Sequence, residues 1–359
     1  MRAGPSTAAL NGALRVGARV HVIRGGVVLA TDVPASDVVL DYTTKNDRKV
    51  PAQLTYTCPA DWYPQSPDDP LACYGQRSLV SMVYRGDDGV DFEVPLGQFV
   101  HSTWEDSRDG VEVTALDLTQ LLEEDPMPWP SSPGRGATVR SELQRLASTI
   151  PVVLDDGVVD AALSRQTQWG TSRTEAIASL AAARGFGVRV GADACLHAYL
   201  VRDASYVDVL YEAGGMLLDV SPADVRGRVA NRWVATGTVT KTGAGGEKTS
   251  EQKITVTRVA DTPPYDHASY GWVTEHVDVS AAEDRKAVED AADKAMSEAL
   301  SASHTCSLTI LPDARLEVGD IVGVVAEDGS RLAGRVAAYS LPVSDATATM
   351  RVDIDILEW

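Results

Sequence analysis

The chain has 359 residues, with 51 acidic and 32 basic side chains and a formal net charge of −19. This length suggests two or three domains, and the acidic balance argues against a protein that binds nucleic acid or anionic membranes non-specifically, because phosphate groups attract clustered lysine and arginine. No apolar run approaches the ~18–20 residues of a membrane span. Arginines interrupt residues 1–26, so we expect neither a signal peptide nor membrane insertion.

The first third is predicted to be antiparallel β structure. Residues 19–24 and 27–30 alternate in polarity around Gly25 and Gly26, which predicts a hairpin. Turn residues separate further predicted strands at 37–42, 52–57, 79–85, 90–94, 99–104 and 111–116. We therefore expect a β barrel or sandwich over residues 1–125, with a proline-rich loop at 59–70.

A proline-broken linker at 123–136 leads into a region with helices. An apolar stripe over 143–150 predicts one helix. Ser172 and Glu175 form a capping box for a second helix, which Gly185 ends, and two strands follow at 187–190 and 196–201. Ser221 followed by Pro222 indicates another helix start. Residues 126–227 are thus predicted to be a small α/β domain.

From residue 228 to 359 the β pattern returns. A long hairpin is expected at 233–240 and 253–259, and Ser280 with Glu283 should cap an inserted helix at 281–303. Strands are predicted at 306–310, 321–326, 331–339 and 350–357. The predicted fold class is therefore mainly β with α+β parts: two antiparallel β domains flank the α/β domain. No sequence repeat is evident, although the two β regions could share a fold.

Glycine-rich stretches do not match nucleotide-binding motifs. In the stretch 243–250, Glu247 stands where a phosphate loop needs glycine, and the stretch joins two strands, so we interpret it as a hairpin turn. The stretch 185–191 follows a helix where a dinucleotide fingerprint requires a strand. We therefore expect no cofactor.

Catalytic and metal-binding patterns are also missing from the sequence. Acidic pairs at 68–69, 87–88, 155–156 and 353/355 look like solvated faces or turns, and the six histidines are isolated; His304 beside Cys306 is the closest pairing of these types. Cys58, Cys73, Cys195 and Cys306 lack zinc-ligand spacing and are expected to be free, although Cys58 and Cys73 could meet across a loop. We predict no catalytic, cofactor or metal residues and no enzyme activity.

Four stretches, in order along the chain, resemble the tail-hub (baseplate-hub-like) minor tail proteins of bacteriophages, particularly phages of actinobacteria. They are the hairpin and following strand at 20–48, the pair 95–99 with 111–117, the alanine- and glutamate-rich helix at 280–303, and the stretch 308–322. The last contains Arg315-Leu316 and Gly319-Asp320 in the family's P-x-L-x-x-G-D-x-V pattern. The proline-rich loop at 59–70 has no counterpart in that pattern.

The resemblance implies a structural virion protein at the tail tip. It implies that the two β domains are tube-like and that three chains form a pseudo-sixfold ring, which extends or closes the tail tube and conducts DNA at ejection without binding it specifically. The implied partners are a distal tail protein or tube ring, the tape measure protein and tip or fibre proteins.

The net charge adds a hypothesis about the ring: acidic side chains lining its channel would repel passing DNA phosphates. Acidic residues that merely solubilise the outer wall are the alternative. Two other functions stay open. A tail-associated hydrolase would need a further domain, which we do not expect after the last predicted strand. A receptor- or carbohydrate-binding tip protein would rest on Trp62, Tyr63 and Tyr74 near the proline-rich loop.

Overall fold

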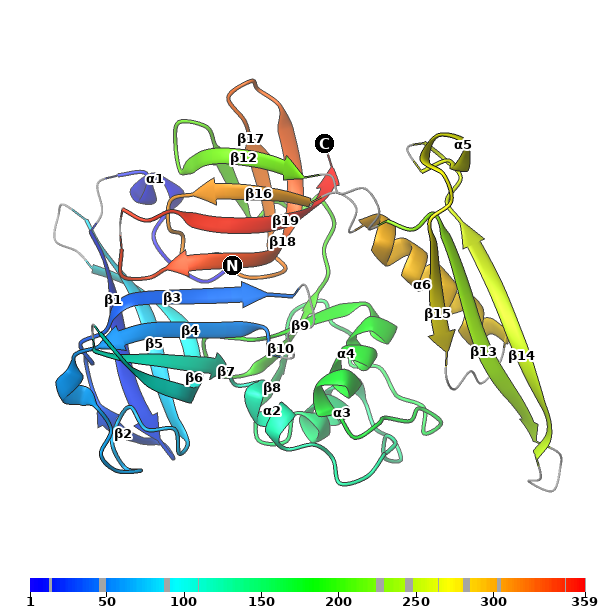
Figure 1. The fold of residues 1–359 in the computed structure, drawn as a ribbon, viewed down its shortest axis with the longest axis horizontal. Helices are drawn as coiled ribbons and strands as arrows, with labels where there is room; N and C mark the ends of the chain where they lie inside the picture. The colour runs from blue at the N-terminus through cyan, green and yellow to red at the C-terminus, as the bar shows by residue number, and fades with distance from the viewer. Residues whose placement is uncertain are drawn as a thin grey trace. The chain divides into compact units, whose positions relative to one another are not determined.

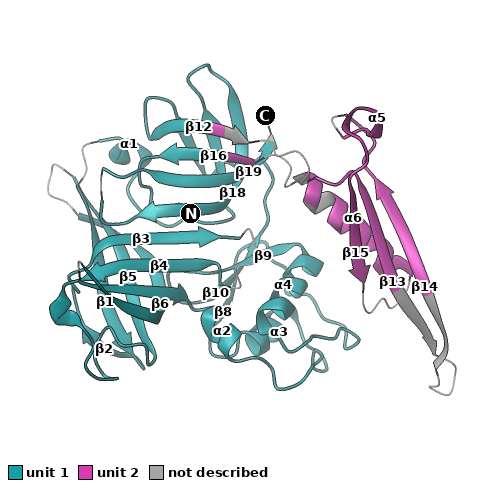
Figure 2. Cartoon of the chain, viewed as in Figure 1, with its two compact units in different colours: residues 1–220, 307–359 teal, residues 221–306 magenta. Residues whose placement is uncertain are grey.

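The computed structural model describes residues 1–12, 15–44, 50–86, 91–108, 110–223, 229–242, 248–263, 265–279, 285–301, 305–345 and 347–358. The chain divides into two compact units, Met1–Val220 with Ser307–Trp359 and Ser221–Cys306 (Figure 2). The predicted fold class is confirmed, because the chain is mainly β, with one large sheet and short helical parts. The predicted boundaries at residues 125 and 227 stay predictions.

The first part of unit 1 consists of strands that mostly bury alternate residues, the pattern of a sheet with one face on a core. The predicted hairpin at 19–30 is confirmed: its two strands pair antiparallel, and Gly25 and Gly26 adopt φ of +56° and +82° in the turn. The strands are β1 (Arg15–Arg24), β2 (Val27–Ala30), β3 (Ser36–Thr43), β4 (Ala52–Cys58), β5 (Gln76–Arg85), β6 (Asp91–Ser107) and β7 (Gly110–Asp117).

Strands from the C-terminal part of unit 1 join these to make a 13-stranded sheet. They are β11 (Val209–Glu212), β12 (Leu217–Ala223), β16 (Thr305–Ile310), β17 (Ile321–Val325), β18 (Arg331–Pro342) and β19 (Met350–Glu358). The two parts have the same strand order, β3-β4-β7-β6-β5-β1 in the first and β12-β16-β19-β18-β17-β11 in the second. The two parts therefore share a strand order that the sequence does not show as a repeat, although β11 pairs parallel to β17 whereas β1 pairs antiparallel to β5.

Strands β3 and β18 join the two parts of the sheet. They pair antiparallel, with Leu40 opposite Leu341, and these two side chains are 1% and 0% exposed. The rings of Tyr42 and Tyr339 lie 5.8 Å apart across the same pairing. In Figure 1 the strands β12, β16, β19, β18, β3 and β4 lie side by side. We call the β3–β18 pairing the internal seam.

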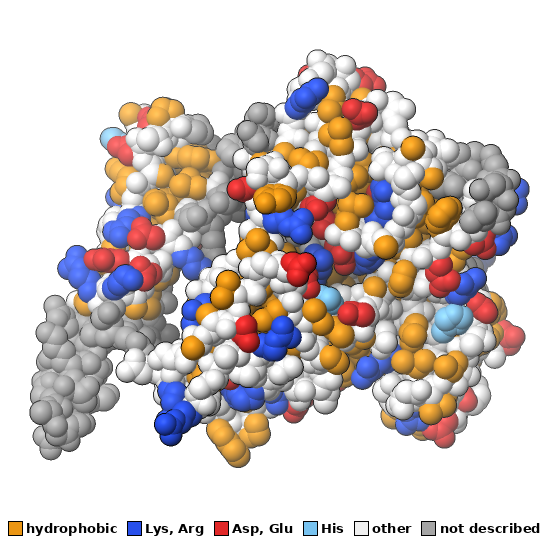
Figure 3. All heavy atoms as spheres, turned by 180° about the vertical axis from the view of Figure 1, so that it is seen from behind, with side chains coloured by type: hydrophobic (Ala, Val, Ile, Leu, Met, Phe, Trp, Pro, Cys, Tyr) orange, Lys and Arg blue, Asp and Glu red, His pale blue; other side chains and the backbone are white. Residues whose placement is uncertain are grey.

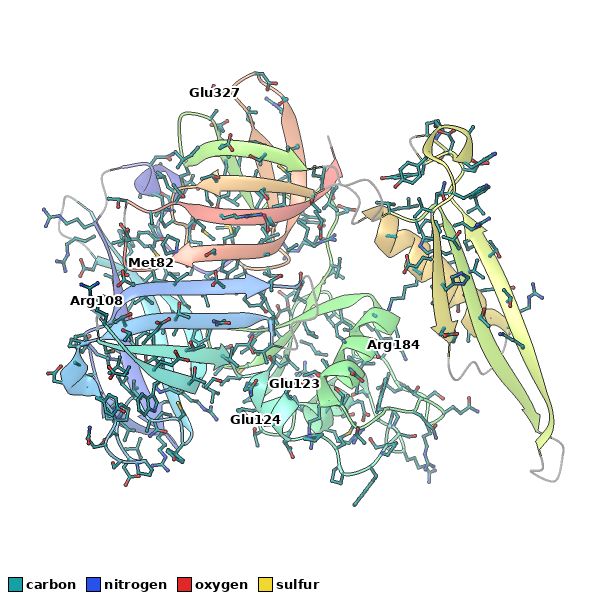
Figure 4. All side chains as sticks on the ribbon, viewed as in Figure 1. Met82, Arg108, Glu123, Glu124, Arg184 and Glu327 are labelled. Carbon is teal, nitrogen blue, oxygen red and sulfur yellow. The ribbon has the colours of Figure 1, made fainter. Side chains whose placement is uncertain are left out.

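The α/β part has its own core within unit 1, formed by α2 (Gln120–Glu124), α3 (Val139–Leu146), α4 (Arg173–Arg184) and the sheet β8-β10-β9 (Val152–Leu154, Leu196–Leu200, Phe186–Val190). Both predicted helices are present, although α3 begins four residues before the apolar stripe at 143–150 and ends at Leu146. Ser172 caps α4 by accepting a hydrogen bond from the Glu175 N–H, and Gly185 ends it in the left-handed conformation with φ of +70°. Glu123 on α2, labelled in Figure 4, accepts a hydrogen bond from the Thr174 hydroxyl of α4.

Unit 2 is a three-stranded sheet covered by one helix. The sheet order is β14 (Lys248–Val259), β13 (Arg232–Thr242) and β15 (Thr274–Val279), and α5 (His267–Tyr270) precedes β15. The predicted hairpin is confirmed as the antiparallel pair β13–β14, and the inserted helix is α6 (Arg285–Ser301). Val288 and Ala292 of α6 pack on Ala235 and Val256. The turn at 243–247 and the cap residues 280 and 283 lie outside the described residues.

The helix predicted to start at Ser221 and Pro222 is wrong, because both residues belong to strand β12. β12 is the last strand in the sheet order, and proline is tolerated in an edge strand because its missing N–H interrupts no interior ladder. Its partner β16 follows more than eighty residues later, beyond the reach of a local pattern. In the part of the chain that is described, no helix is long and apolar enough to cross a membrane.

Candidate functional site

Eight neighbouring strands of the large sheet form a continuous surface, in the order β12-β16-β19-β18-β3-β4-β7-β6. We call them the eight-strand row. One face of the row packs on the core. This face carries buried apolar side chains, among them Leu40, Leu54, Tyr56, Val113, Leu308, Tyr339, Leu341, Val352 and Ile354. The opposite face is built from the residues between them, because successive side chains of a strand point to opposite sides of a sheet.

The face opposite the core is lined mainly by small polar side chains. Most are half-buried by their neighbours. The neutral members include Gln53, Thr55, Thr57, Thr103, Thr114, Thr305, Ser307, Thr309 and Ser340, with Val39, Leu116 and Ala338 among them. We call this surface the polar face. Sequence reasoning expected strands here but did not identify this surface, whose signal is the recurrence of Thr and Ser at every second position.

Charges on the polar face are few and mostly acidic. Asp41, Glu105, Glu112, Asp353 and Asp355 lie on it, and Arg335 and Arg351 are basic side chains beside them. Asp353 accepts hydrogen bonds from Ser307 at 2.5 Å and from the Arg351 guanidinium at 3.1 Å. Glu105 and Glu112 stand directly opposite each other on β6 and β7, a like-charge pairing that opposes strand association. The face therefore carries only a small part of the chain's net charge of −19.

The stretch 308–322, which carries part of the family resemblance, contains a buried ion pair between the ends of two strands. β16 ends at Ile310 and β17 begins at Ile321, and the intervening loop buries Asp313 completely. The Arg315 guanidinium donates to both Asp313 carboxylate oxygens at 2.9 and 2.7 Å, and the Tyr211 hydroxyl donates to Asp313 at 2.9 Å. Such a fully bonded buried pair fixes geometry more than it adds stability.

The same loop holds the beginning of the chain against the sheet. Arg2 donates to the carbonyl oxygens of Ala314 and Leu316 at 3.0 and 2.8 Å. Glu317 lies 3.7 Å from Arg2 and 3.1 Å from Arg189 of β9. Burial alone would raise the pKa of Glu317, but the two guanidinium groups outweigh it and hold that pKa below its usual value. This cluster ties the N-terminal segment, the α/β part and the second β part together.

One titratable group lies beside a cavity between the α/β part and the sheet. His197 Nδ1 is 2.7 Å from Asp155, and its Nε2 is 3.1 Å from Asp193. Burial opposes the charged imidazole, yet the two carboxylates outweigh burial and raise the pKa of His197. The cavity that His197 lines, about 350 Å³, carries charges of both signs, from Asp155, Asp193, Glu317, Arg2 and Arg189. Figure 3 shows charged side chains of both signs gathered near the middle of the face turned away in Figure 1.

No nucleophile accompanies this histidine. Cys195 is the neighbouring thiol, but burial and the nearby Asp193 carboxylate raise its pKa, so it stays protonated and unreactive at neutral pH. None of the four cysteines forms a disulfide, and burial raises the pKa of Cys58 to about 12. Among the described residues, no group of three or more His, Cys, Asp and Glu side chains is placed to hold a metal ion.

Several members of the acidic pairs singled out in the sequence have structural partners. Asp68 pairs with Arg24, and Asp69 accepts backbone hydrogen bonds in its own turn, which lower its pKa. Asp355 lies on the same side of β19 as Asp353 and stands opposite Arg335 of β18. Residues 87–88, His304 and the glycine-rich turn at 243–247 lie outside the described residues.

The aromatic residues of the proline-rich loop do not form one cluster. The loop contains the single-turn helix η1 (Ala60–Trp62), and the Tyr63 ring beside it packs edge-on against Trp104 of β6 at 4.7 Å. Tyr74 is 63% exposed and takes part in none of the described ring pairs. A carbohydrate platform of Trp62, Tyr63 and Tyr74 therefore gains no support from this geometry.

The fold is similar to that of solved tail proteins. The tail protein from Neisseria meningitidis MC58 matches with a TM-score of 0.64 and 13% identity, over 94% of this chain and 96% of that one. The 43 kDa tail protein of prophage MuSo2 from Shewanella oneidensis matches with a TM-score of 0.57 and 13% identity, over 94% and 98% of the two chains. Prophage tail protein gp18 from Listeria monocytogenes EGD-e matches with 0.52 and 11%, over 94% of both.

No family model matches the sequence, and no curated protein matches it significantly. The solved structures therefore establish a likeness of fold. At that level the resemblance to phage tail and baseplate-hub-like proteins is confirmed.

Proposed function

We propose that the chain is a structural protein of a phage-type tail, and that three copies form a hub ring at the tail tip. The observation that carries the proposal is the eight-strand row, which is apolar on its core side and lined by small polar side chains on the other. The fold likeness to tail proteins over 94% of the chain supports the same assignment.

The polar face suits the wall of a channel through which DNA passes. A duplex binds to clustered Lys and Arg, and each released counterion adds to that affinity. This face offers Thr, Ser and Gln side chains with a few carboxylates, Arg335 and Arg351. Three copies would therefore present a mildly acidic wall to which the phosphate backbone has little tendency to bind.

Three eight-strand rows would give a closed wall of twenty-four strands. At about 4.8 Å between strands, the circumference is roughly 115 Å and the width roughly 37 Å between backbones, before strand tilt widens it. Allowing for side chains, an open aqueous channel remains, as in closed barrels with far fewer strands. The ring would connect a sixfold tube to a threefold tip because each chain contributes two parts with the same strand order.

The neighbours in the particle follow from this position. We infer contacts with a distal tail protein or tube ring on one side, with tip or fibre proteins on the other, and with the tape measure protein. DNA would pass transiently and without specific binding. A structural role also agrees with the buried, mutually bonded state of the described titratable clusters, which serve packing.

Immunogold labelling of the particle that contains this chain tests the assignment. Antibodies raised against the purified chain should label one end of the tail, at its tip, with no signal along the tail shaft. Label spread over the head or along the shaft would contradict a tip hub.

A further inference from the structure

The internal seam provides a template for how one copy of the chain joins the next. At this seam β3, the first strand of one part, pairs with the later half of β18, from Ala338 to Pro342. The earlier half of β18, from Arg331 to Arg335, pairs instead with β17. β18 thus leaves one neighbour and accepts another along its length.

Strand β6 has the same construction as β18. Its earlier half pairs with β5 as far as Val100, as β18 pairs with β17. Its later half pairs with β7 on one side, as β18 pairs with β19, and the described pairings give this half no strand on the other side. Both strands shift register at the changeover, between His101 and Thr103 in β6 and between Val336 and Ala338 in β18. Such a bulge adds one residue and bends the strand. The later half of β6 is therefore the counterpart of the part of β18 that accepts β3.

Two strand edges correspond to the two sides of the internal seam but do not pair with each other within one chain. β12 occupies the position of β3, at the end of the row, and the later half of β6 occupies the position of β18 at the other end. Seven strand spacings of about 4.8 Å separate them, or roughly 34 Å across the sheet. One chain cannot bring them together, whereas a second copy can.

Exposure at the later half of β6 contrasts with burial at the seam. Ala337 and Leu341 of β18 are 3% and 0% exposed, while Ser102 and Asp106, their counterparts counted from the two bulges, are exposed. On β12, Leu218 is 51% exposed. An unpaired strand edge with an exposed apolar side chain is a template for pairing with another chain.

We propose that β12 of one copy pairs with the 102–107 stretch of β6 in a second copy, and that this external seam repeats the internal one. The contact is heterologous, since different surfaces meet, and it forms a closed ring when the rotation between copies closes. Both outer edges of the eight-strand row are then paired. The proposal rests on the proposed hub ring and adds to it the residues through which the copies join.

Cross-linking on the full chain tests the external seam. Val220→Cys on β12 and Glu105→Cys on β6 are introduced together, and the assembled protein is treated with a short bismaleimide. We expect covalent dimers and trimers on a denaturing gel. The matched control combines Val220→Cys with Val159→Cys, since Val159 is 76% exposed in the α/β part and belongs to neither strand. The parent chain measures the background from its four cysteines.

A charge on the β12 edge provides a second test. Leu218→Arg should raise the concentration for half-assembly at least tenfold, and Leu210→Arg, at a similarly exposed leucine on β11, should leave it unchanged. Circular dichroism confirms that both variants fold. Rings that form without seam cross-links, or that tolerate Leu218→Arg, would overturn the external seam and leave the hub ring standing. A parent chain that stays monomeric at high concentration would overturn both.

Discussion

Replacing Leu341 with alanine tests whether the internal seam makes the two β parts one cooperative unit. Leu341 is 0% exposed and stands opposite Leu40, so truncation removes buried apolar contact and leaves a cavity. Such substitutions lower the free energy of unfolding by about 3 kcal/mol in well-packed cores. Because the seam joins the two parts into one sheet, the loss should reach strands far from the substitution.

Hydrogen exchange followed by mass spectrometry reads this out strand by strand. A loss of ~3 kcal/mol corresponds to roughly 100-fold faster exchange of amides that open only on global unfolding. We expect that acceleration in peptides of β4, in the first part, as well as in β19. The control is Val27→Ala on β2, which is 63% exposed and should change little. Acceleration confined to β16–β19, with β4 unchanged, would refute the reasoning and indicate two independently unfolding parts.

Three further predictions concern single groups, each measured by urea unfolding. Asp313→Asn should lower the free energy of unfolding by about 3 kcal/mol, because it leaves the buried Arg315 charge uncompensated. The control Glu327→Gln, on an exposed turn labelled in Figure 4, should leave that free energy unchanged. Equal effects of the two substitutions would contradict a structural ion pair. Gly110→Ala should lower the free energy of unfolding by at least about 2 kcal/mol, since φ is +139° and an added Cβ would lie 2.0 Å from the Cys58 carbonyl oxygen. An unchanged free energy would mean that the β6–β7 hairpin relaxes to make room for the methyl group. His101 of β6 is buried, and burial lowers its pKa to about 4. Its contribution to the free energy of unfolding is therefore complete above the pKa of the unfolded chain, near 6.5, and is lost as the pH falls toward 4. Between pH 7 and 4 the parent should therefore lose ~3 kcal/mol more than His101→Asn, and parallel profiles would show that His101 is not buried in its neutral form.

Local sequence patterns predicted much of the secondary structure. Alternation and turn residues located the hairpin β1–β2 and the pair β13–β14, and cap chemistry located both ends of α4. These features depend on neighbours a few residues apart. The one wrong helix start, at Ser221 and Pro222, has the local chemistry of a helix N-terminus, and pairing with the distant β16 makes it a strand instead.

The candidate site depends on contacts that no local pattern contains. The internal seam pairs residues near 40 with residues near 340. The two parts of the sheet share a strand order, but no repeat of residues in the sequence reveals it. The stretch 308–322 resembles a family motif, yet the reason for its charged residues becomes visible only where Arg315 contacts Asp313 and Glu317 lies beside Arg2. The acidic-channel hypothesis used the net charge alone, whereas the polar face is mostly uncharged, with a mild excess of carboxylates.

The mass of the purified chain in solution, measured by light scattering and followed by electron micrographs of the same peak, tests the central claim most directly. The account predicts a species of three chains, about three times 38.2 kDa, with a central opening. A compact monomer with no ring at any concentration would contradict it.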